Sequence, residues 1–109
     1  MLMHLARRAD WEEAQAAGVY PWSTLGLTAD EVGYVHASDG PEQTAGVYER
    51  FYAHLGEPVI LLRIDEAALA EHGIEVIREP ATDAGGDLFP HLYGGTIPLR
   101  AVTEVTAYP

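Results

Sequence analysis

One stretch of the chain, residues 58–65, constrains the fold more than any other. Four consecutive apolar residues, Val59 to Leu62, are followed after one arginine by Ile64. A strand with one solvated face alternates apolar and polar residues, so an unbroken run predicts a central strand that is covered on both faces. With 109 residues the chain has enough surface to bury for one such core. We therefore expect a single domain, residues 1–109.

Helical and strand patterns both occur along the rest of the chain, which predicts a small α+β domain. The clearest helix is expected over residues 41–55, where apolar side chains recur along one side. This predicted face comprises Ala45, Tyr48, Phe51, Tyr52 and Leu55. Shorter helices are expected over residues 10–18 and 66–72, and strands over residues 1–6, 32–37, 74–79 and 100–108.

The segments between these elements also have expected roles. Asp10 and Ser38 are predicted to cap the N-termini of the helices that follow them. Residues 20–27 mix turn formers and aromatics, which predicts an irregular segment that forms one wall of a cleft. Residues 80–87 predict a mobile polar loop, because they contain a pair of glycines among polar residues.

The composition excludes several classes of function. The chain has no cysteine, which rules out disulfides, thiolate metal sites and a cysteine nucleophile. Its net charge is −11 and all 6 of its basic residues are arginines, so DNA and long RNA are poor partners. A small anionic ligand is compatible with this charge, because a few arginines or a helix N-terminus can bind phosphate locally. No apolar stretch approaches the roughly 18 residues of a membrane helix, and we expect a cytoplasmic protein without membrane contact.

Three histidines occupy positions that strand geometry can bring together: His4, His36 and His91. The spacing leaves two interpretations open, a binding or catalytic cluster and a set of buried histidines fixed by hydrogen bonds. A zinc site built from the three is a weaker alternative, because they form no tight ligand pair and no carboxylate stands beside them at ligand spacing. His54 and His72 fall at the ends of helices and are expected to be surface residues.

Other polar residues accompany these histidines. Ser38 is predicted to cap a helix, a role that is compatible with a ligand contact. A serine hydrolase that uses Ser23 or Ser38 is disfavoured, because no Gly-x-Ser-x-Gly elbow is present. Glu79 ends a strand just before Pro80, which either aims its carboxylate into a cleft or leaves it solvated. The two glycines after Tyr93 either let the backbone approach a ligand closely or form a turn.

A series of motifs spans nearly the whole chain. It comprises His4, Trp11, Gly18, Tyr20, the segment Gly33-Tyr34-Val35-His36-Ala37-Ser38, Gln43, Leu62, Ile64, Asp65, Glu79 and the segment Leu88-Phe89-Pro90-His91-Leu92-Tyr93-Gly94. This series resembles the characteristic motifs of a bacterial family known as domain of unknown function 952. The chain departs from the family at three positions, with Met3, Ala37 and Gly95 where an aromatic residue, Cys and Pro are common.

The resemblance implies a fold and a cofactor. The family is described as sharing an α+β fold with ADP-ribosyltransferases and RNA 2′-phosphotransferases. That likeness implies a split, antiparallel sheet with flanking helices and a cleft for nicotinamide adenine dinucleotide (NAD). It also implies that His4 and His36 bind the ribose and nicotinamide groups. The third position of such sites falls on Glu79 or on residues 89–93, and the chain has no clear equivalent of the catalytic Glu of the transferases.

These observations lead to two main hypotheses. The first is an ADP-ribosyltransferase-like or phosphotransferase-like enzyme, whose candidate catalytic residues are His4, His36, Glu79 and His91. In that hypothesis NAD or a related nucleotide contacts His4, Tyr20, Ser23, His36, Ser38 and Tyr93. The second is a binding module, or an enzyme for an unrelated small metabolite, that uses the same pocket without transferase chemistry. A metal-dependent hydrolase is a third and weaker hypothesis, and we expect no metal site.

Overall fold

Short strands and helices follow one another through the residues that the computed structural model describes, 2–80 and 87–109. The strands are β1 (Leu2–Arg7), β2 (Val19–Tyr20), β3 (Trp22–Thr24), β4 (Leu27–Thr28), β5 (Val35–His36), β6 (Ser38–Asp39), β7 (Val59–Ile64), β8 (Glu75–Pro80), β9 (Leu88–Tyr93), β10 (Ile97–Pro98) and β11 (Val102–Tyr108). The helices are α1 (Arg8–Ala17), α2 (Ala29–Val32), α3 (Gly40–Val47) and α4 (Glu66–Glu71), with a π-helical turn at Tyr48–Tyr52 and a 3-10 turn at Leu99–Ala101.

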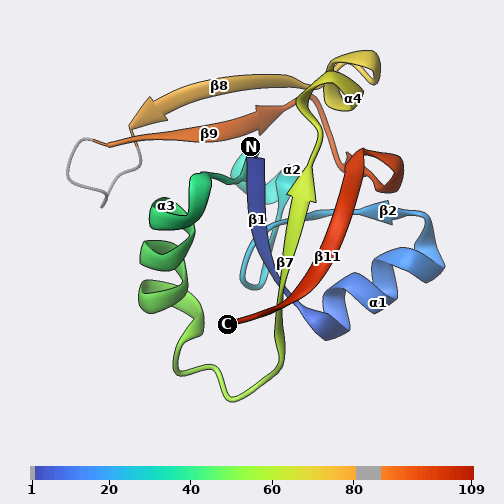
Figure 1. The fold of residues 1–109 in the computed structure, drawn as a ribbon. Coiled ribbons are helices and arrows are strands. Elements are labelled where there is room, and N and C mark those ends of the chain that lie inside the picture. The colour runs from blue at the N-terminus through green and yellow to red at the C-terminus, as the bar shows by residue number, and fades with distance from the viewer. Residues whose placement is uncertain (1, 81–86) are drawn as a thin grey trace.

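A four-stranded antiparallel sheet forms the centre of the fold, in the order β11-β7-β1-β6 (Figure 1). A second antiparallel sheet has the order β5-β9-β8, and two short ribbons pair β10 with β2 and β3 with β4. The chain passes from the second sheet to the first at Ala37, between β5 and β6. The predicted α+β fold with antiparallel sheets is therefore confirmed.

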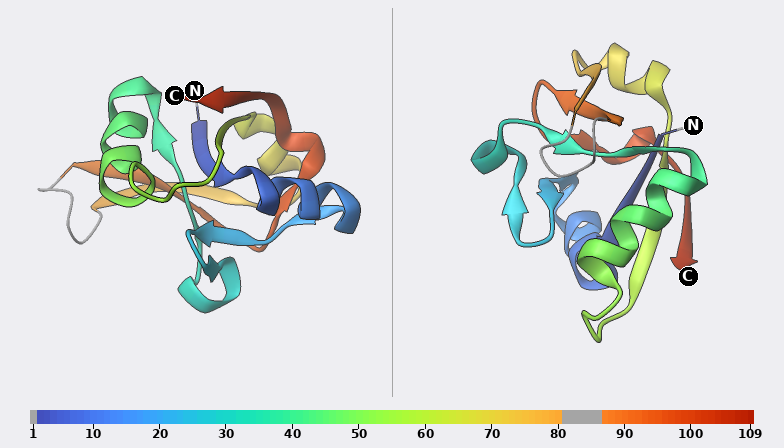
Figure 2. Two further views of the ribbon diagram at one scale, coloured as in Figure 1. Left: turned by 90° about the horizontal axis from the view of Figure 1, so that it is seen from below. Right: turned by 90° about the vertical axis from the view of Figure 1, so that its left-hand side faces the viewer.

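The central strand β7 is buried on both faces, as its apolar run predicts. Leu62 and Ile64 belong to a core that includes Trp11 of α1, whereas Leu61 belongs to a second core that includes Val47 of α3. The helices α1 and α3 accordingly lie on opposite sides of the sheet (Figures 1 and 2). Each large apolar side chain that is fully buried in this way stabilises the fold by roughly 1.5–3 kcal/mol.

The strands β8 and β9 run across the first sheet and carry the motif around His91 (Figure 1). β9 pairs with β5 through two residue pairs, Val35 with Leu92 and His36 with His91. Because side chains alternate along a strand, one face of this sheet packs Val35 and Leu92 into the core while the other carries the histidines. The predicted polar loop over residues 80–87 lies mostly outside the described residues.

The helix predicted over residues 41–55 is present, but only its first part is α-helical. It is α-helical to Val47 and then becomes a π turn. Backbone hydrogen bonds in a π turn span five residues instead of four, so the side of the helix that faces the sheet shifts. Tyr52 is buried as predicted, whereas Ala45 and Phe51, which were assigned to the same face, are exposed.

Neither Asp10 nor Ser38 caps a helix, contrary to prediction. α1 begins two residues before Asp10, and the Asp10 carboxylate accepts two hydrogen bonds from Arg7, at 2.9 and 3.1 Å. Ser38 lies in β6 opposite Met3, and the residue before α3 is Asp39. In both places β1 contributes the partner. Arg7 binds the side chain of Asp10, and Met3 pairs with Ser38 in the sheet.

Residues 20–37 also differ from expectation. Within residues 20–27, the short strands β2, β3 and β4 contain Tyr20, Trp22–Thr24 and Leu27, whereas Leu25 and Gly26 form the turn between β3 and β4, so the predicted irregular segment is only partly irregular. The strand predicted over residues 32–37 is shortened to β5, because α2 extends to the residue before Gly33. Thr28 and Glu31 form a capping box that starts α2, and Gly33 ends it with a φ of +100°, which favours glycine.

Candidate functional site

His4 projects from β1 into the core with both ring nitrogens engaged. Its Nδ1 lies 2.6 Å from the carbonyl oxygen of His36, and its Nε2 lies 3.0 Å from the hydroxyl of Tyr20. Because a carbonyl oxygen only accepts, Nδ1 carries the proton. Burial lowers the pKa of His4 to about 4, so the ring is neutral at pH 7 and Nε2 accepts from Tyr20. His4 therefore ties β1 to β2 and β5.

A small pocket lies beside His4, between β1, β3, the β5–β6 segment, α3 and the π turn. It leaves about 10 Å³ for the centre of a water-sized sphere, which corresponds to about one water molecule. Its polar lining includes His4, Ser23, His36 and Ser38. Ser23 is fully buried, and its hydroxyl has no hydrogen-bond partner among the described residues. Such a hydroxyl is costly, so the pocket suits a water molecule or one polar group of a ligand.

A second group of polar residues, Glu79, His91 and Tyr93, forms a cluster on one face of β8 and β9. The Nδ1 of His91 lies 2.7 Å from Oε1 of Glu79, and the hydroxyl of Tyr93 donates to the same oxygen. The bonds from Tyr93 and His91 hold the pKa of Glu79 below its usual value, so the carboxylate is ionised at neutral pH. The bond to Glu79 raises the pKa of Tyr93 to about 12. Because an ionised carboxylate only accepts, the proton of His91 lies on Nδ1.

The other ring nitrogen of His91 has no such partner. His91 is 2% exposed, and its Nε2 has no hydrogen-bond partner within residues 2–80 and 87–109. The ring of Tyr34 is stacked on the imidazole, with centroids 4.0 Å apart and planes 19° from parallel. General acid–base catalysis uses this arrangement, in which the Nδ1 of an imidazole donates to a carboxylate and Nε2 exchanges a proton with the substrate.

His36 connects the pocket with the cluster. It lines the pocket, and its ring centroid lies 5.5 Å from that of His91. The structure thus brings the three histidines of the sequence motifs into one region. Ser23, Ser38 and Tyr20 lie at the pocket end of that region, and Glu79 and Tyr93 lie at the cluster end. The catalytic and binding roles of these residues stay predictions.

Sequence reasoning did not assign several residues of this region to the site. Tyr34 alternates with His36 along the chain, and this shared strand face is a signal that would have found it. Thr24 and Tyr52 also line the pocket. Tyr52 is carried there by the π turn, which no local pattern predicts. His54 and His72 are exposed, as expected.

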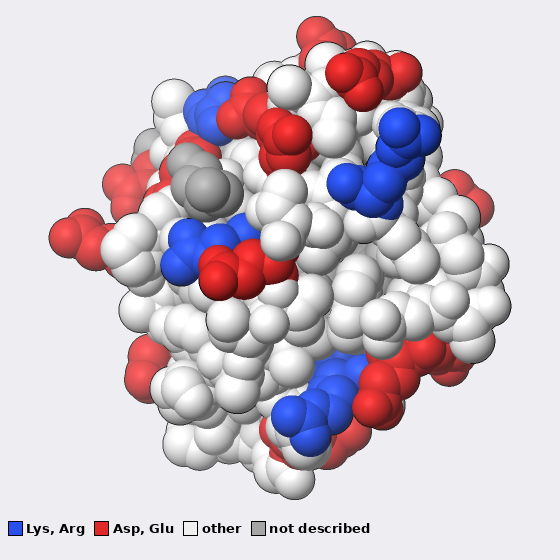
Figure 3. All heavy atoms as spheres, turned by 45° about the vertical axis from the view of Figure 1, so that its right-hand side comes forward, with Lys and Arg blue, Asp and Glu red and all other residues white. Residues whose placement is uncertain are grey.

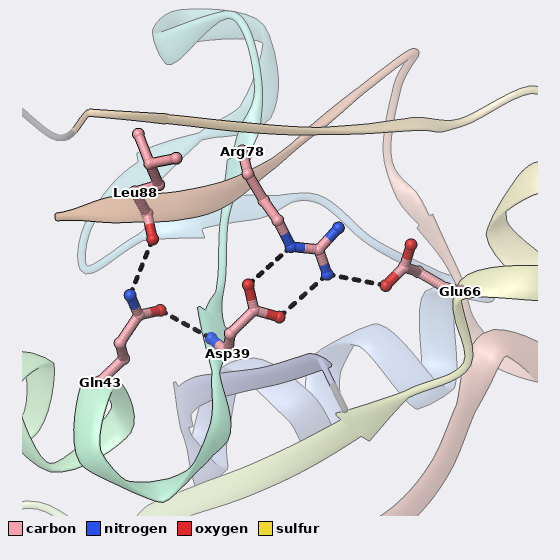
Figure 4. A network of polar contacts seen from close by, with 5 residues as sticks. All are labelled: Asp39, Gln43, Glu66, Arg78 and Leu88. Atoms are coloured by element: carbon pink, nitrogen blue, oxygen red, sulfur yellow. Dashed lines mark hydrogen bonds and ion pairs between the residues drawn. The ribbon is translucent and has the colours of Figure 1, made fainter.

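A polar network fixes the hairpin β8–β9 against the helices (Figure 4). The side chain of Gln43 donates to the carbonyl oxygen of Leu88 and accepts from the backbone N–H of Asp39, both at 2.8 Å. Arg78 donates to both carboxylate oxygens of Asp39, at 2.7 and 3.0 Å, and to Glu66 at 2.9 Å. The charged side chains of this network are 32–49% exposed, so each ion pair contributes little to the free energy of folding. Their contribution is to hold the strands that carry the cluster.

Several arginines of the surface lie beside carboxylates, and Figure 3 shows blue and red groups adjacent on one face. Arg7 contacts Asp10, Arg63 contacts Glu104 at 2.7 Å, and Arg78 contacts two carboxylates. Such pairing leaves these arginines poorly placed to bind a phosphate. Among the described residues no three His, Asp or Glu side chains are arranged to hold a metal ion, and no helix is long and apolar enough to cross a membrane.

The fold and the site define a class of protein: a small α+β domain with a histidine–carboxylate cluster beside a polar pocket of about one water molecule. The sequence matches the family described as "Protein of unknown function (DUF952)" over residues 5–105, and the chain belongs to this family. The predicted family is thereby confirmed, whereas its relationship to ADP-ribosyltransferases stays a prediction. A search of curated proteins found no match.

A solved structure shares the fold. The X-ray crystal structure of protein CC0527 from Caulobacter crescentus aligns with a TM-score of 0.77 and 24% sequence identity, covering 97% of this chain and 83% of that chain. The structure of a double mutant of the same protein gives the same values. At this level of identity the likeness establishes the fold alone.

Proposed function

We propose that this protein is an enzyme that performs general acid–base chemistry on a small polar molecule. The observation that carries the proposal is the state of His91, whose Nδ1 donates to Glu79 while its buried Nε2 has no partner among the described residues. At Nε2 the ring takes a proton from a hydroxyl of the ligand or from water. Glu79 holds the tautomer and stabilises the imidazolium that forms.

NAD or a related nucleotide is the first candidate ligand, and a transferase reaction of the ADP-ribosyl or phosphoryl type is the first candidate chemistry. The support for both is the resemblance of the motifs to a family described as sharing the ADP-ribosyltransferase fold. In this proposal the pocket beside Ser23 and His36 receives one ribose hydroxyl. Cleavage of a glycosidic bond develops positive charge on the sugar, and the ionised Glu79 is the negative group that stabilises it.

An uncharged or cationic metabolite, bound with or without turnover, is the second candidate ligand. The charge of the protein favours it, because the net charge is −11 and Arg7, Arg63 and Arg78 are already paired with carboxylates. A diphosphate would have to displace a carboxylate or rely on other donors. In either case we propose a cytoplasmic protein that does not bind DNA.

Calorimetric titration with NAD, followed by chromatographic detection of released nicotinamide, tests the first candidate. Wild type and His54→Ala, a control at an exposed histidine, are expected to bind NAD alike, and His36→Ala is expected to lose binding. His91→Gln is expected to retain binding and lose turnover by about 100-fold or more, the usual effect of removing a general base. Unchanged turnover in His91→Gln would remove the acid–base role. Absence of NAD binding to wild type at millimolar concentration would move the assignment to the second candidate.

A further inference from the structure

Within the described residues, the longest strand at the edge of a sheet is β11, at the rim of the central sheet (Figure 1). Among these residues it pairs with β7 alone, and its side chains from Thr103 to Ala107 are exposed. Half of the backbone N–H and C=O groups of such a strand point away from the sheet and have no strand partner. An exposed edge of this kind is a template for pairing with another strand.

The other edges of the two sheets are protected against such pairing. β5 and β6, at one edge of each sheet, are only 2 residues long. β8 carries the charged residues Glu75, Arg78 and Glu79 and ends at Pro80, which has no N–H. Short strands, charges and proline are the means by which proteins blunt the edges of their sheets. Pairing with another chain is therefore expected at β11 rather than at β5, β6 or β8.

The later part of β11 lacks most of these protections. A bulge between Val102 and Glu104 interrupts its start, but residues 104–108 run in regular register with β7. The one charged residue of this stretch, Glu104, lies 2.7 Å from Arg63 of β7, so the edge carries little net charge. Val105 is 42% exposed, and a neighbouring strand would cover this apolar side chain.

The sequence of this stretch fits an antiparallel copy of itself. Because outward-facing backbone groups alternate along a strand, two identical antiparallel strands pair about a residue that lies opposite its own copy. A register centred on Glu104 places two carboxylates face to face, which is destabilising. A register centred on Val105 draws the bulged residue Thr103 into the pair. The register centred on Thr106 avoids both and uses the whole regular stretch.

We propose that two copies of this protein pair through antiparallel β11 strands about Thr106, which joins their four-stranded sheets into one continuous sheet. Glu104 then lies opposite Tyr108 and Val105 opposite Ala107. The outward backbone groups of both edges gain hydrogen-bond partners, as they do wherever a strand is added to a sheet. β11 contributes no residue to the candidate site, so the pairing stands apart from the acid–base function proposed above.

The pairing is expected to be weak and to strengthen with salt. One strand from each copy buries less surface than the roughly 1,600 Å² of a standard interface. Each copy has a net charge of −11, so the two molecules repel each other although the paired edges are nearly neutral. Raising the salt from about 0.1 M to about 1 M shortens the screening length from about 10 Å to about 3 Å, which removes much of this repulsion.

Sedimentation velocity at protein concentrations up to about 1 mM tests the dimer, in the range where weak interfaces associate. The dimer fraction of the wild type is expected to rise with protein concentration and with salt. Thr106→Glu places two carboxylates opposite each other and is expected to weaken dimerisation by about tenfold or more. Thr103→Glu makes the same change of charge at another exposed threonine of β11 and is the matched control, expected to dimerise as the wild type does.

Cross-linking tests the register, because the chain has no cysteine of its own. Thr106→Cys brings the two new thiols opposite each other in the dimer, within the range of a disulfide. Thr103→Cys places its two thiols about 20 Å apart in the same register, at about 3.4 Å for each residue along the strand. Mild oxidation is therefore expected to link the Thr106→Cys protein into dimers and to leave the Thr103→Cys protein mostly unlinked.

Three outcomes would overturn the proposal. A wild type that stays monomeric at about 1 mM protein in about 1 M salt would exclude a second copy and leave the edge to a strand of another protein. Equal dimerisation of Thr106→Glu and Thr103→Glu would place the dimer contact outside β11. Equal cross-linking of the two cysteine variants would refute the register. If circular dichroism shows that Thr106→Glu is unfolded, the cysteine variants decide, because cysteine is close to threonine in size.

Discussion

Acidification from pH 7 to pH 4 is expected to destabilise the fold through His4. The pKa of this residue is about 4 in the folded protein and about 6.5 in the unfolded chain. Because the folded-state pKa is the lower one, the unfolded chain takes up the proton first. Stability contributed by the neutral ring is therefore fully present above pH 6.5 and is lost progressively as the pH falls toward 4.

The magnitude follows from the difference between the two pKa values, 6.5 minus about 4, or about 2.5 units. At about 1.4 kcal/mol for each unit, the loss reaches about 3 kcal/mol at pH 4. Burial is the cause, because a charged imidazolium at this position gives up its hydration. Protonation also gives Nε2 a hydrogen where it now accepts from Tyr20, so the tyrosine hydroxyl must turn round. A small domain has about 5–15 kcal/mol in total, so this loss is large.

Urea denaturation at pH 7 and pH 4, in wild type and His4→Gln, measures this contribution. The glutamine amide retains a donor and an acceptor but does not titrate. Carboxylates with lowered pKa values, such as Glu79, also lose stabilising interactions in acid, and they cancel in the comparison because both proteins contain them. The wild type should lose about 3 kcal/mol more than His4→Gln over this range. His54→Gln, at an exposed histidine, should behave as wild type. Equal losses in wild type and His4→Gln would refute the reasoning.

Three further predictions concern the same region and its supports. Tyr20→Phe removes the donor to Nε2 of His4 and should lower the unfolding free energy at pH 7 by about 1–2 kcal/mol in urea denaturation, whereas Tyr108→Phe should not. Glu79→Gln removes the ionised acceptor of Tyr93, so the pKa of Tyr93 should fall from about 12 toward its ordinary value of about 10; tyrosinate absorbance detects this, with Glu75→Gln on the same strand as control. Gly94→Ala places a Cβ 2.7 Å from the carbonyl oxygen of Gly73 at a φ of +126° and should cost about 2–4 kcal/mol. Gly46→Ala in α3, where nothing lies within 4 Å, should be neutral or stabilise by up to about 1 kcal/mol, and similar melting of the two alanine variants would contradict the steric argument.

The central part of the fold was predictable because its signal is local and strong. The apolar run of β7 has no polar position until Arg63, so burial on both faces was the one arrangement that left no large apolar face in water. The turn residues Gly18 and Gly73 likewise mark the ends of their helices, because each takes a positive φ that other residues avoid.

The helix face and the caps were not predictable by the same reasoning. The predicted face assumes a regular α-helical period from Ala45 to Phe51, and the π turn after Val47 interrupts that period. The start of α2 was a missed local signal instead. Thr28 and Glu31 have the three-residue spacing of a capping box, which predicts a helix where a strand was expected to begin shortly afterwards.

The sequence could predict which residues belong to the candidate site, but not which contacts they make with one another. Alternation of side chains along β5 and β8 places His36 and Glu79 on the partly exposed face of the second sheet, and the sequence motifs include both. Their partners come from distant segments: His4 bonds to a carbonyl 32 residues away and to a hydroxyl 16 residues away. Such pairings depend on strand register and packing, which no local pattern encodes.

The contacts that each residue of the site makes decide which substitutions are informative about ligand binding. Replacing His4 by alanine removes two hydrogen bonds that join β1 to β2 and β5, so a loss of binding in that variant has a structural explanation. Ser23 has no such bond among the described residues, and its hydroxyl lines the same pocket. A ligand group that occupies the pocket gains a partner in Ser23, so Ser23→Ala removes affinity without removing a contact that holds the fold. The serine is therefore the better probe of the pocket, although the histidine is the more conspicuous residue in the sequence.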